Sequence, residues 1–223
     1  MCNVTYLPKI RQTKFLKLKK HGIRHIIFDL GGVIIDLDTS KTVRGMAQWM
    51  EIGEEEALKV FHEDDRFKQY EKGEISDADF RDFIRGLAPN SLTDEAIDDV
   101  WNAMLLDIPG ERIRLLQALK PHYSLYLLSN TNAIHLEDVV LKLGQQGISS
   151  FKELFDAEYY SHLVGMRKPD AEIYEHVLED QGLAAQETIF FDDNPDNIKS
   201  ARSLGIQTFH VLHPNDVLTY FNG

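Results

Sequence analysis

Cysteine is almost absent from this sequence, because Cys2 is the only one among its 223 residues. A single cysteine forms no disulfide within the chain and builds no cysteine-ligated zinc site. Long apolar runs are also missing, since no stretch approaches the roughly 18 residues of a membrane-spanning helix. The composition therefore predicts a cytoplasmic protein that has no membrane partner.

Positive charge is scarce as well. Lys and Arg number 24 against 36 Asp and Glu, which gives a net charge of −12 at pH 7. Such a surface repels a polyanion unless a local basic patch dominates, so nucleic acid is not an expected partner. A small anionic ligand stays compatible with this charge, provided that a local cation meets it.

The basic residues are concentrated at the start of the chain. Residues 1–22 form a basic extension, and no acid occurs before Asp29. Two interpretations are open: a solvated extension that folds against the acidic body, or a transit peptide. The absence of serine from this segment favours the first.

Short apolar runs alternate with helix-like segments along the rest of the chain. The β-rich runs span 23–30, 123–130, 154–161, 188–193 and 207–212, and the helix-like segments span 109–120, 131–146, 169–180 and 194–204. The runs are continuous rather than alternating, as in Ile26-Ile27-Phe28, which is typical of strands buried on both faces of a parallel sheet. The pattern predicts an α/β fold with a doubly wound parallel sheet.

The gap between the first two strands is far longer than the later ones. Its sequence indicates four or five helices, one with Phe80, Phe83 and Ile84 on a single face and one that starts near Thr93. We expect residues 40–108 to form an inserted helical cap. The α/β core would then comprise residues 23–39 and 109–223.

Polar residues stand where the predicted strands end, namely Asp29, Ser129, Asn130, Lys168, Asp192 and Asp193. The carboxyl ends of parallel strands meet at one edge of a sheet, and ligands bind there. Asp29 and Asp193 could hold Mg2+, a cation that prefers oxygen ligands. The metal and Lys168 would offset the charge of a phosphate dianion, while Ser129 would hydrogen-bond one of its oxygens.

Four motifs stand at these strand ends: FDLGGV at 28–33, LLSN at 127–130, GMRKPD at 165–170 and FFDDNPDNIKSARSLGI at 190–206. Together they resemble the motifs of haloacid dehalogenase (HAD) superfamily phosphohydrolases that carry a helical cap after the first strand. With the cap, the resemblance covers roughly residues 23–212. It implies a HAD-like Rossmannoid core and a covalent mechanism.

The resemblance also implies a role for each strand-end residue. Asp29 would be the nucleophile, attacking phosphorus to give an aspartyl-phosphate that water then hydrolyses. Mg2+ would be bound by Asp29, the Gly31 carbonyl and Asp193, and Asp192 and Asn197 would support these ligands from a second layer. The phosphoryl oxygens would be bound by Ser129, Asn130 and Lys168.

One position departs from the usual pattern of the family. Most of its phosphatases carry a second Asp two residues after the nucleophile, as general acid and base, where this chain has Gly31. General acid–base catalysis typically raises the rate by ~10² to 10⁴, so its loss slows the cleavage of esters with poor leaving groups most. A subgroup resembling bacterial α-D-glucose-1-phosphate phosphatases shares Asp-Leu-Gly here, followed by acids like Asp36 and Asp38. We therefore expect a Mg2+-dependent phosphatase of a small phosphorylated metabolite, such as a sugar 1-phosphate.

Other interpretations stay open. The chain could be a phosphate-binding protein without turnover, or a 2-haloacid dehalogenase, although a dehalogenase needs no metal and the acid pair at 192–193 favours one. Substrate choice would lie in the cap, near residues 66–72. Each site residue also has a purely structural alternative. Asp29 and Gly31-Gly32 could shape a turn, Ser129 could cap a helix, and Lys168 could lie in solvent. The pair Asp192-Asp193 could start a helix, and Asp36 and Asp38 could be acids of a surface hairpin.

Overall fold

The computed structural model describes residues 22–222. Almost all of the predicted basic extension, residues 1–22, and with it Cys2, therefore lies outside the described part of the chain. No helix within residues 22–222 has the length and apolar character that crossing a bilayer requires.

A five-stranded parallel sheet forms the centre of the molecule, with the strand order β3-β2-β1-β4-β5. The strands are β1 (His25–Phe28), β2 (Ser124–Ser129), β3 (Ala157–Tyr160), β4 (Thr188–Asp192) and β5 (Gln207–His210). In the central strand, Ile26 pairs with Leu125 of β2 and Ile189 of β4. The predicted α/β fold with a doubly wound parallel sheet is confirmed.

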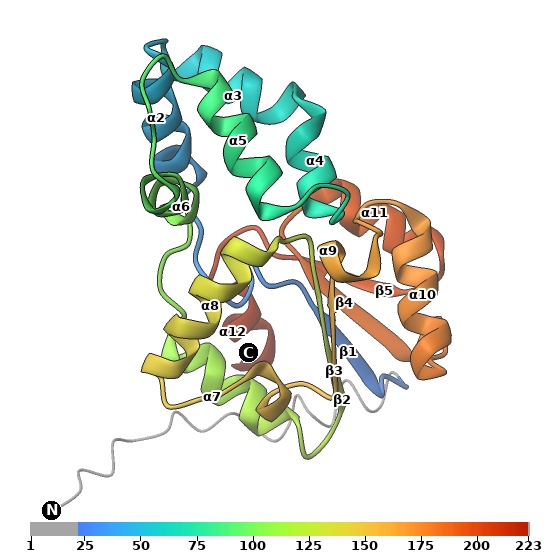
Figure 1. Cartoon of the computed structure of the whole chain (residues 1–223). Coiled ribbons are helices and arrows are strands. Elements are labelled where there is room, and N and C mark those ends of the chain that lie inside the picture. The colour runs from blue at the N-terminus through green and yellow to red at the C-terminus, as the bar shows by residue number, and fades with distance from the viewer. Residues whose placement is uncertain (1–21, 223) are drawn as a thin grey trace, which may run out of the picture.

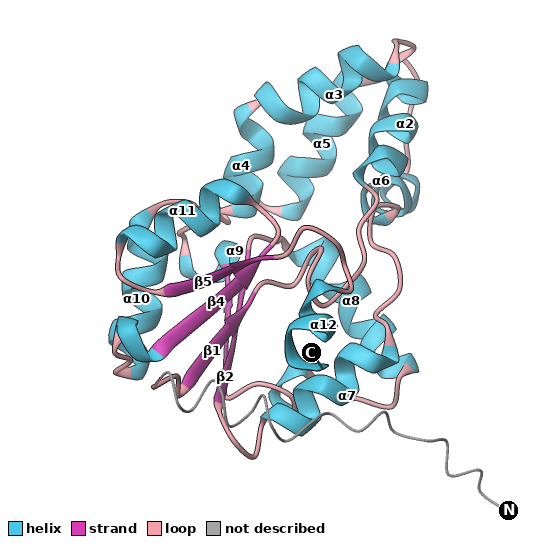
Figure 2. Ribbon diagram, turned by 180° about the vertical axis from the view of Figure 1, so that it is seen from behind, coloured by secondary structure: helices cyan, strands magenta, loops and turns pink. Residues whose placement is uncertain are grey.

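Both faces of the sheet are buried, and this explains the continuous apolar runs. Successive residues of β1 point to opposite faces, so Ile26 and Phe28 join one core cluster while Ile27 joins another. The first face is covered by α7 (Gly110–Leu119), α8 (Ala133–Gln145) and α12 (Asp216–Asn222), and the second by α10 (Ala171–Gln181) and α11 (Pro195–Ser203) (Figure 2). The short helix α9 (Ser161–Val164) and the 3-10 turn η2 (Ala185–Glu187) also lie on the second face, whereas the 3-10 turn η1 (Phe151–Glu153) packs on the first face through Phe151.

Five helices stand above the carboxyl edge of the sheet, in the segment expected to form the cap (Figure 1). They are α2 (Thr39–Met50), α3 (Glu54–Glu63), α4 (Asp65–Glu71), α5 (Asp77–Leu87) and α6 (Asp94–Asn102). They share a core of their own around Phe67, Phe80 and Trp101. Local signals set their ends: Ser76 forms a capping box at α5, and the Thr93 hydroxyl accepts from Ala96 N at α6.

The chain enters and leaves these five helices through two linkers that lie side by side. Asp36 N donates to Asp107 O at 3.1 Å, Leu106 N donates to Asp36 O at 2.9 Å, and Asp38 N donates to Met104 O at 2.9 Å. These backbone hydrogen bonds fix the base of the cap on the core.

Asp36 and Asp38, expected as surface hairpin acids, have more specific roles in the structure. The Asp38 carboxylate accepts from Ser40 N and caps α2. The Asp36 carboxylate lies 2.7 Å from a guanidinium nitrogen of Arg112, whose side chain is 1% exposed. The same guanidinium donates to Ile34 O at 3.2 Å, so a buried cation of α7 holds the loop after β1 in place.

A second joint between cap and core is built around a buried histidine. The His135 ring of α8 stacks on Trp101 of α6, with centroids 4.7 Å apart. Asn132 Nδ2 donates to His135 Nδ1 (3.2 Å), which leaves the ring proton on Nε2, and Nε2 donates to Trp101 O (3.1 Å). Burial lowers the pKa of His135 to about 4, so this imidazole is neutral at pH 7.

The packing of the central strands predicts a strong effect for one substitution. Leu127 in β2 is fully buried, so Leu127→Ala should lower the free energy of unfolding by ~2 to 5 kcal/mol through lost burial and a residual cavity. The matched control is Leu141→Ala, because Leu141 in α8 is 64% exposed and its change should stay within about 0.5 kcal/mol. Urea unfolding followed by circular dichroism measures both, and equal losses would contradict the assigned burial.

His135 predicts how stability depends on pH. In the unfolded state it takes up a proton near its ordinary pKa of 6.5, but the folded state does so only near 4. The unfolded state therefore binds more protons between these values, and the free energy of unfolding should fall by ~3 kcal/mol from this group as pH drops from 6.5 to 4.

Urea unfolding at pH 7.0 and pH 4.5 tests this dependence. The difference in stability between the two pH values should be smaller in His135→Gln than in the wild type. The control His62→Gln removes an exposed imidazole of α3 and should keep the wild-type difference. An unchanged pH difference in His135→Gln would count against the neutral, buried assignment.

Candidate active site

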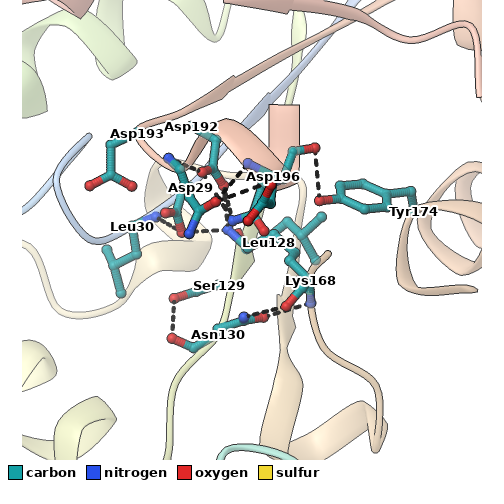
Figure 3. A network of polar contacts seen from close by, with 12 residues as sticks. Asp29, Leu30, Leu128, Ser129, Asn130, Lys168, Tyr174, Asp192, Asp193 and Asp196 are labelled. Carbon is teal, nitrogen blue, oxygen red and sulfur yellow. Dashed lines mark hydrogen bonds and ion pairs between the residues drawn. The ribbon is translucent and has the colours of Figure 1, made fainter. Parts of the chain in front are cut away.

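The nucleophile candidate Asp29 sits at the carboxyl edge of the sheet, directly after β1 (Figure 3). Its backbone N–H donates to Phe191 O at 2.9 Å, which extends the pairing of β1 with β4 and fixes the position of the carboxylate. Leu30 N donates to Asp29 Oδ1 at 2.7 Å. The side chain is nearly buried, and the turn role considered for Asp29 is therefore only part of what it does.

Lys168 is the cation of the site. Its side chain is 1% exposed, and its ammonium donates to Asp29 Oδ1 (2.7 Å), Asp192 Oδ2 (2.7 Å) and Leu128 O (2.9 Å). Three acceptors satisfy all three donors of the ammonium. Burial alone lowers the pKa of Lys168, but the charges of Asp192 and Asp29 outweigh burial and raise it. The alternative of a lysine in solvent is wrong.

Two residues at the end of β2 approach the same edge. The Asn130 side chain brackets the Lys168 backbone, because its Nδ2 donates to Lys168 O and its Oδ1 accepts from Lys168 N, both at 2.8 Å. Ser129 is 3% exposed and does not cap α8, since Asn132 does so by accepting from His135 N. The phosphate contacts expected of Ser129 and Asn130 stay predictions.

Asp192 and Asp193 are neighbours with different surroundings. Asp192 is fully buried, and its two oxygens accept from Lys168, from Asn197 Nδ2 (3.0 Å) and from Asn194 N (2.7 Å). Asp193 is exposed and lies beside Asp29 and Leu30 (Figure 3). Its carboxylate packs on Gly32, which adopts a φ of +68°. Asn194, rather than the acid pair, caps α11.

The carboxylates are crowded enough to hold a cation. Asp29, Asp192 and Asp193 each offer an oxygen within 4.8 Å of the other two. Burial raises the pKa of Asp29 to about 7 against the opposing effect of Lys168, and the charges of Asp192 and Asp193 raise it further. Since the oxygens of Asp192 are already hydrogen-bonded, Asp29 and Asp193 are the open ligands, and a hard divalent ion such as Mg2+ suits them.

A cleft of about 320 Å³ separates this edge from the cap. Apart from the strand-end residues, its lining is mostly apolar and includes Leu37, Phe61, Trp101, Met104 and Leu105. Glu71 of α4 and Arg167, which follows α9 in the core, add an ion pair to the lining of the cleft. A larger cavity of about 790 Å³ lies at the opposite edge of the sheet, at His25 and Ser124, and none of the predicted site residues lines it.

The surroundings of Gly31 show what replaces the missing acid. A Cβ on Gly31 would lie 2.6 Å from Leu37 Cδ1, so the leucine side chain fills the space in which a second Asp would begin. Leu37 belongs to the linker into the cap and pairs with Leu105 of the return linker. This wall of the cleft is apolar and supplies no proton.

Sequence reasoning missed several of these cleft residues. Within the range 66–72, Glu71 lines the cleft. Arg66 lies outside the cleft, with its guanidinium 3.8 Å above the Phe83 ring. Arg167 stood inside the motif GMRKPD without a role, and its position next to Lys168 was the available signal. Leu37 and Phe61 carried no signal, because their place depends on how the cap docks.

Comparisons with known proteins identify the family of this chain. Residues 23–205 match a family model described as haloacid dehalogenase-like hydrolase. D-ribitol-5-phosphate phosphatase of Bacteroides thetaiotaomicron is 29% identical over 187 residues, which cover 84% of this chain and 91% of that protein.

Solved structures point the same way. A HAD family enzyme of Bacteroides thetaiotaomicron, in complex with magnesium and inorganic phosphate, aligns with a TM-score of 0.75 at 37% identity, covering 84% of this chain and 93% of that one. L-2-haloacid dehalogenase of Xanthobacter autotrophicus reaches a TM-score of 0.57 at 18% identity, covering 84% and 77% of the two chains, and so shares the fold alone.

The contact between Gly32 and Asp193 predicts a specific loss of metal binding. In Gly32→Ala the new Cβ would lie 2.2 Å from Asp193 Oδ2, so the carboxylate must move and the affinity for Mg2+ should fall about tenfold or more. Titration calorimetry with Mg2+ measures this affinity.

Gly182→Ala is the matched control for that substitution. Gly182 has a similar φ of +62°, but no atom lies within 4 Å of its added Cβ. Both variants carry the strain of a left-handed alanine, about 1 kcal/mol, but only Gly32→Ala should lose Mg2+. Equal affinities in the two variants would contradict a role for Asp193 in the metal site.

Proposed function

Because the chain belongs to the haloacid dehalogenase-like hydrolase family, we propose that it is a Mg2+-dependent phosphatase that acts on a small phosphorylated metabolite. Family membership confirms the resemblance of the four motifs. The observation that carries the proposal is the Asp29 carboxylate, held by Lys168 and placed beside Asp193 at the floor of a cleft. We retain the cytoplasmic location expected from the single cysteine as part of the proposal.

The leaving group we propose is a sugar or a sugar alcohol. The related phosphatase of Bacteroides thetaiotaomicron is named for D-ribitol 5-phosphate, which is a polyol ester. Ribitol 5-phosphate is an alkyl phosphate, and ribitol is a poorer leaving group than the anomeric oxygen of a sugar 1-phosphate. This relative therefore supports a polyol as the leaving group but does not support an anomeric phosphate as the substrate. The sugar 1-phosphate and the corresponding subgroup stay predictions.

The chain's own residues suggest how the reaction proceeds. Oδ1 of Asp29 accepts hydrogen bonds from Lys168 and Leu30 N, which leaves Oδ2 to attack phosphorus. The bond from Oδ2 to phosphorus forms as the bond from phosphorus to the ester oxygen breaks, and the departing alkoxide takes its proton from water because the wall at Gly31 supplies none. A second water then attacks phosphorus, which breaks the bond to Oδ2, releases inorganic phosphate and restores the Asp29 carboxylate. Mg2+, when held by Asp29, Asp193 and the Gly31 carbonyl, would offset charge on the phosphoryl oxygens.

The two other functions receive less support. A dehalogenase binds no metal and would leave the exposed carboxylate of Asp193 beside Asp29 without a purpose, and the dehalogenase compared above shares only the fold. A phosphate-binding protein without turnover would agree with Gly31 and Leu37, since that wall of the cleft supplies no acid. Turnover is therefore the property to measure.

Phosphate release from ribitol 5-phosphate and glucose 1-phosphate tests the proposal. We expect release that requires Mg2+, stops with a chelator and falls by ~10³-fold or more in Asp29→Asn, because the nucleophile is lost. The control Asp99→Asn changes an exposed carboxylate of α6 and should keep the wild-type rate. Binding of inorganic phosphate with no turnover of any ester would overturn the phosphatase and identify a phosphate-binding protein.

A further inference from the structure

An ion pair closes one side of the cleft between cap and core. Glu71 is the last residue of α4, and Arg167 immediately precedes Lys168. Arg167 Nη2 and Nε donate to the same Glu71 oxygen, Oε2, at 2.8 and 3.2 Å. The Glu71 side chain is 30% exposed and the Arg167 side chain 24%, so the pair is partly shielded from water. Both residues line the cleft and are open to it.

The backbone on each side of this pair is held in place. Helix α4 lies beside α9 (Figure 1), and the turn after α4 packs so closely that a Cβ on Gly73 would lie 2.2 Å from His162 O. On the core side, Asn130 brackets the backbone of Lys168, the next residue after Arg167. The pair is therefore fixed relative to Lys168, which lies at the end of the cleft proposed to take the phosphate.

The pair keeps unused hydrogen-bonding capacity. Both bonds use Oε2, and within residues 22–222 neither Glu71 Oε1 nor Arg167 Nη1 takes part in a hydrogen bond. One is an acceptor and the other a donor. A hydroxyl group both donates and accepts, so hydroxyl groups match this combination, and a charged partner raises the strength of each bond.

The charges at this end of the cleft favour a neutral ligand. Glu71 and Arg167 offset each other, and Phe61 and Trp101, which line the same cleft, are apolar. A second anionic group on the leaving group would meet Glu71, and an ammonium would meet Arg167. Carbon-bound hydrogens of a polyol would pack on the apolar walls.

We propose that Glu71 and Arg167 are specificity-determining residues that bind hydroxyl groups of the leaving group. They select a neutral, polyhydroxylated phosphate ester over an ester that lacks hydroxyls or carries a second negative charge. This inference rests on the proposed phosphatase function and names the part of the substrate that the cap reads.

The test compares two esters in the same enzyme. We take the ratio of kcat/KM for ribitol 5-phosphate to kcat/KM for phenyl phosphate, which has no hydroxyl. In Glu71→Ala this ratio should fall roughly 10- to 100-fold, the loss expected for a hydrogen bond to a charged group. Glu74→Ala is the matched control, because Glu74 pairs with Lys72 at 2.8 Å outside the cleft and should leave the ratio unchanged.

A second measurement tests the charge preference and the fold of the variant. Removing Glu71 leaves the Arg167 cation unpaired, so Glu71→Ala should raise kcat/KM for 4-carboxyphenyl phosphate relative to phenyl phosphate. Glu71→Gln keeps the size and an acceptor oxygen and should lower the polyol ratio less than alanine does. Thermal melting shows whether each variant is folded.

The outcomes separate the two proposals. Equal losses for ribitol 5-phosphate and phenyl phosphate in folded Glu71→Ala or Glu71→Gln would overturn the specificity role and leave the phosphatase standing. Release of phosphate by the wild-type protein from none of the esters, glucose 1-phosphate included, would overturn the phosphatase and the specificity role together.

Discussion

The site depends on one buried ammonium and its three acceptors. Lys168 joins the end of β1 through Asp29, the end of β4 through Asp192 and the end of β2 through Leu128 O. An uncompensated buried charge costs ~3 to 5 kcal/mol, so each carboxylate needs the lysine as much as the lysine needs them. The three strand ends are therefore locked in one arrangement, and the nucleophile candidate is held by the interaction that stabilises the edge of the sheet.

Much of this arrangement could be predicted from sequence because it follows from local patterns. Continuous apolar runs such as Ile26-Ile27-Phe28 indicate strands buried on both faces, and parallel strands bring their carboxyl ends together. The order of the strands along the chain therefore suffices to place Asp29, Lys168 and Asp192 at one edge. Helix α9 was missed, because four residues are too few to show a helical period.

What could not be predicted depends on contacts between distant parts of the chain. Glu71 and Arg167 are 96 positions apart, and their pairing follows from how α4 docks beside α9. Asp36 resembled a solvent-facing acid because nothing nearby in sequence shows that Arg112 would be buried against it. Ser129 resembled a helix cap for a local reason, because the sequence did not show that β2 continues to Ser129 and that α8 begins only after Asn132.

The paired linkers at residues 36–38 and 104–107 have a consequence for how such an enzyme can change. Because the chain departs and returns at neighbouring points joined by hydrogen bonds, the intervening helices form a cassette whose ends already meet. Exchange of that cassette would replace the wall of the cleft that faces the substrate, while the residues at the strand ends of the sheet stay unchanged. The segment that contacts the substrate and the segment that breaks the bond can therefore evolve independently within one polypeptide.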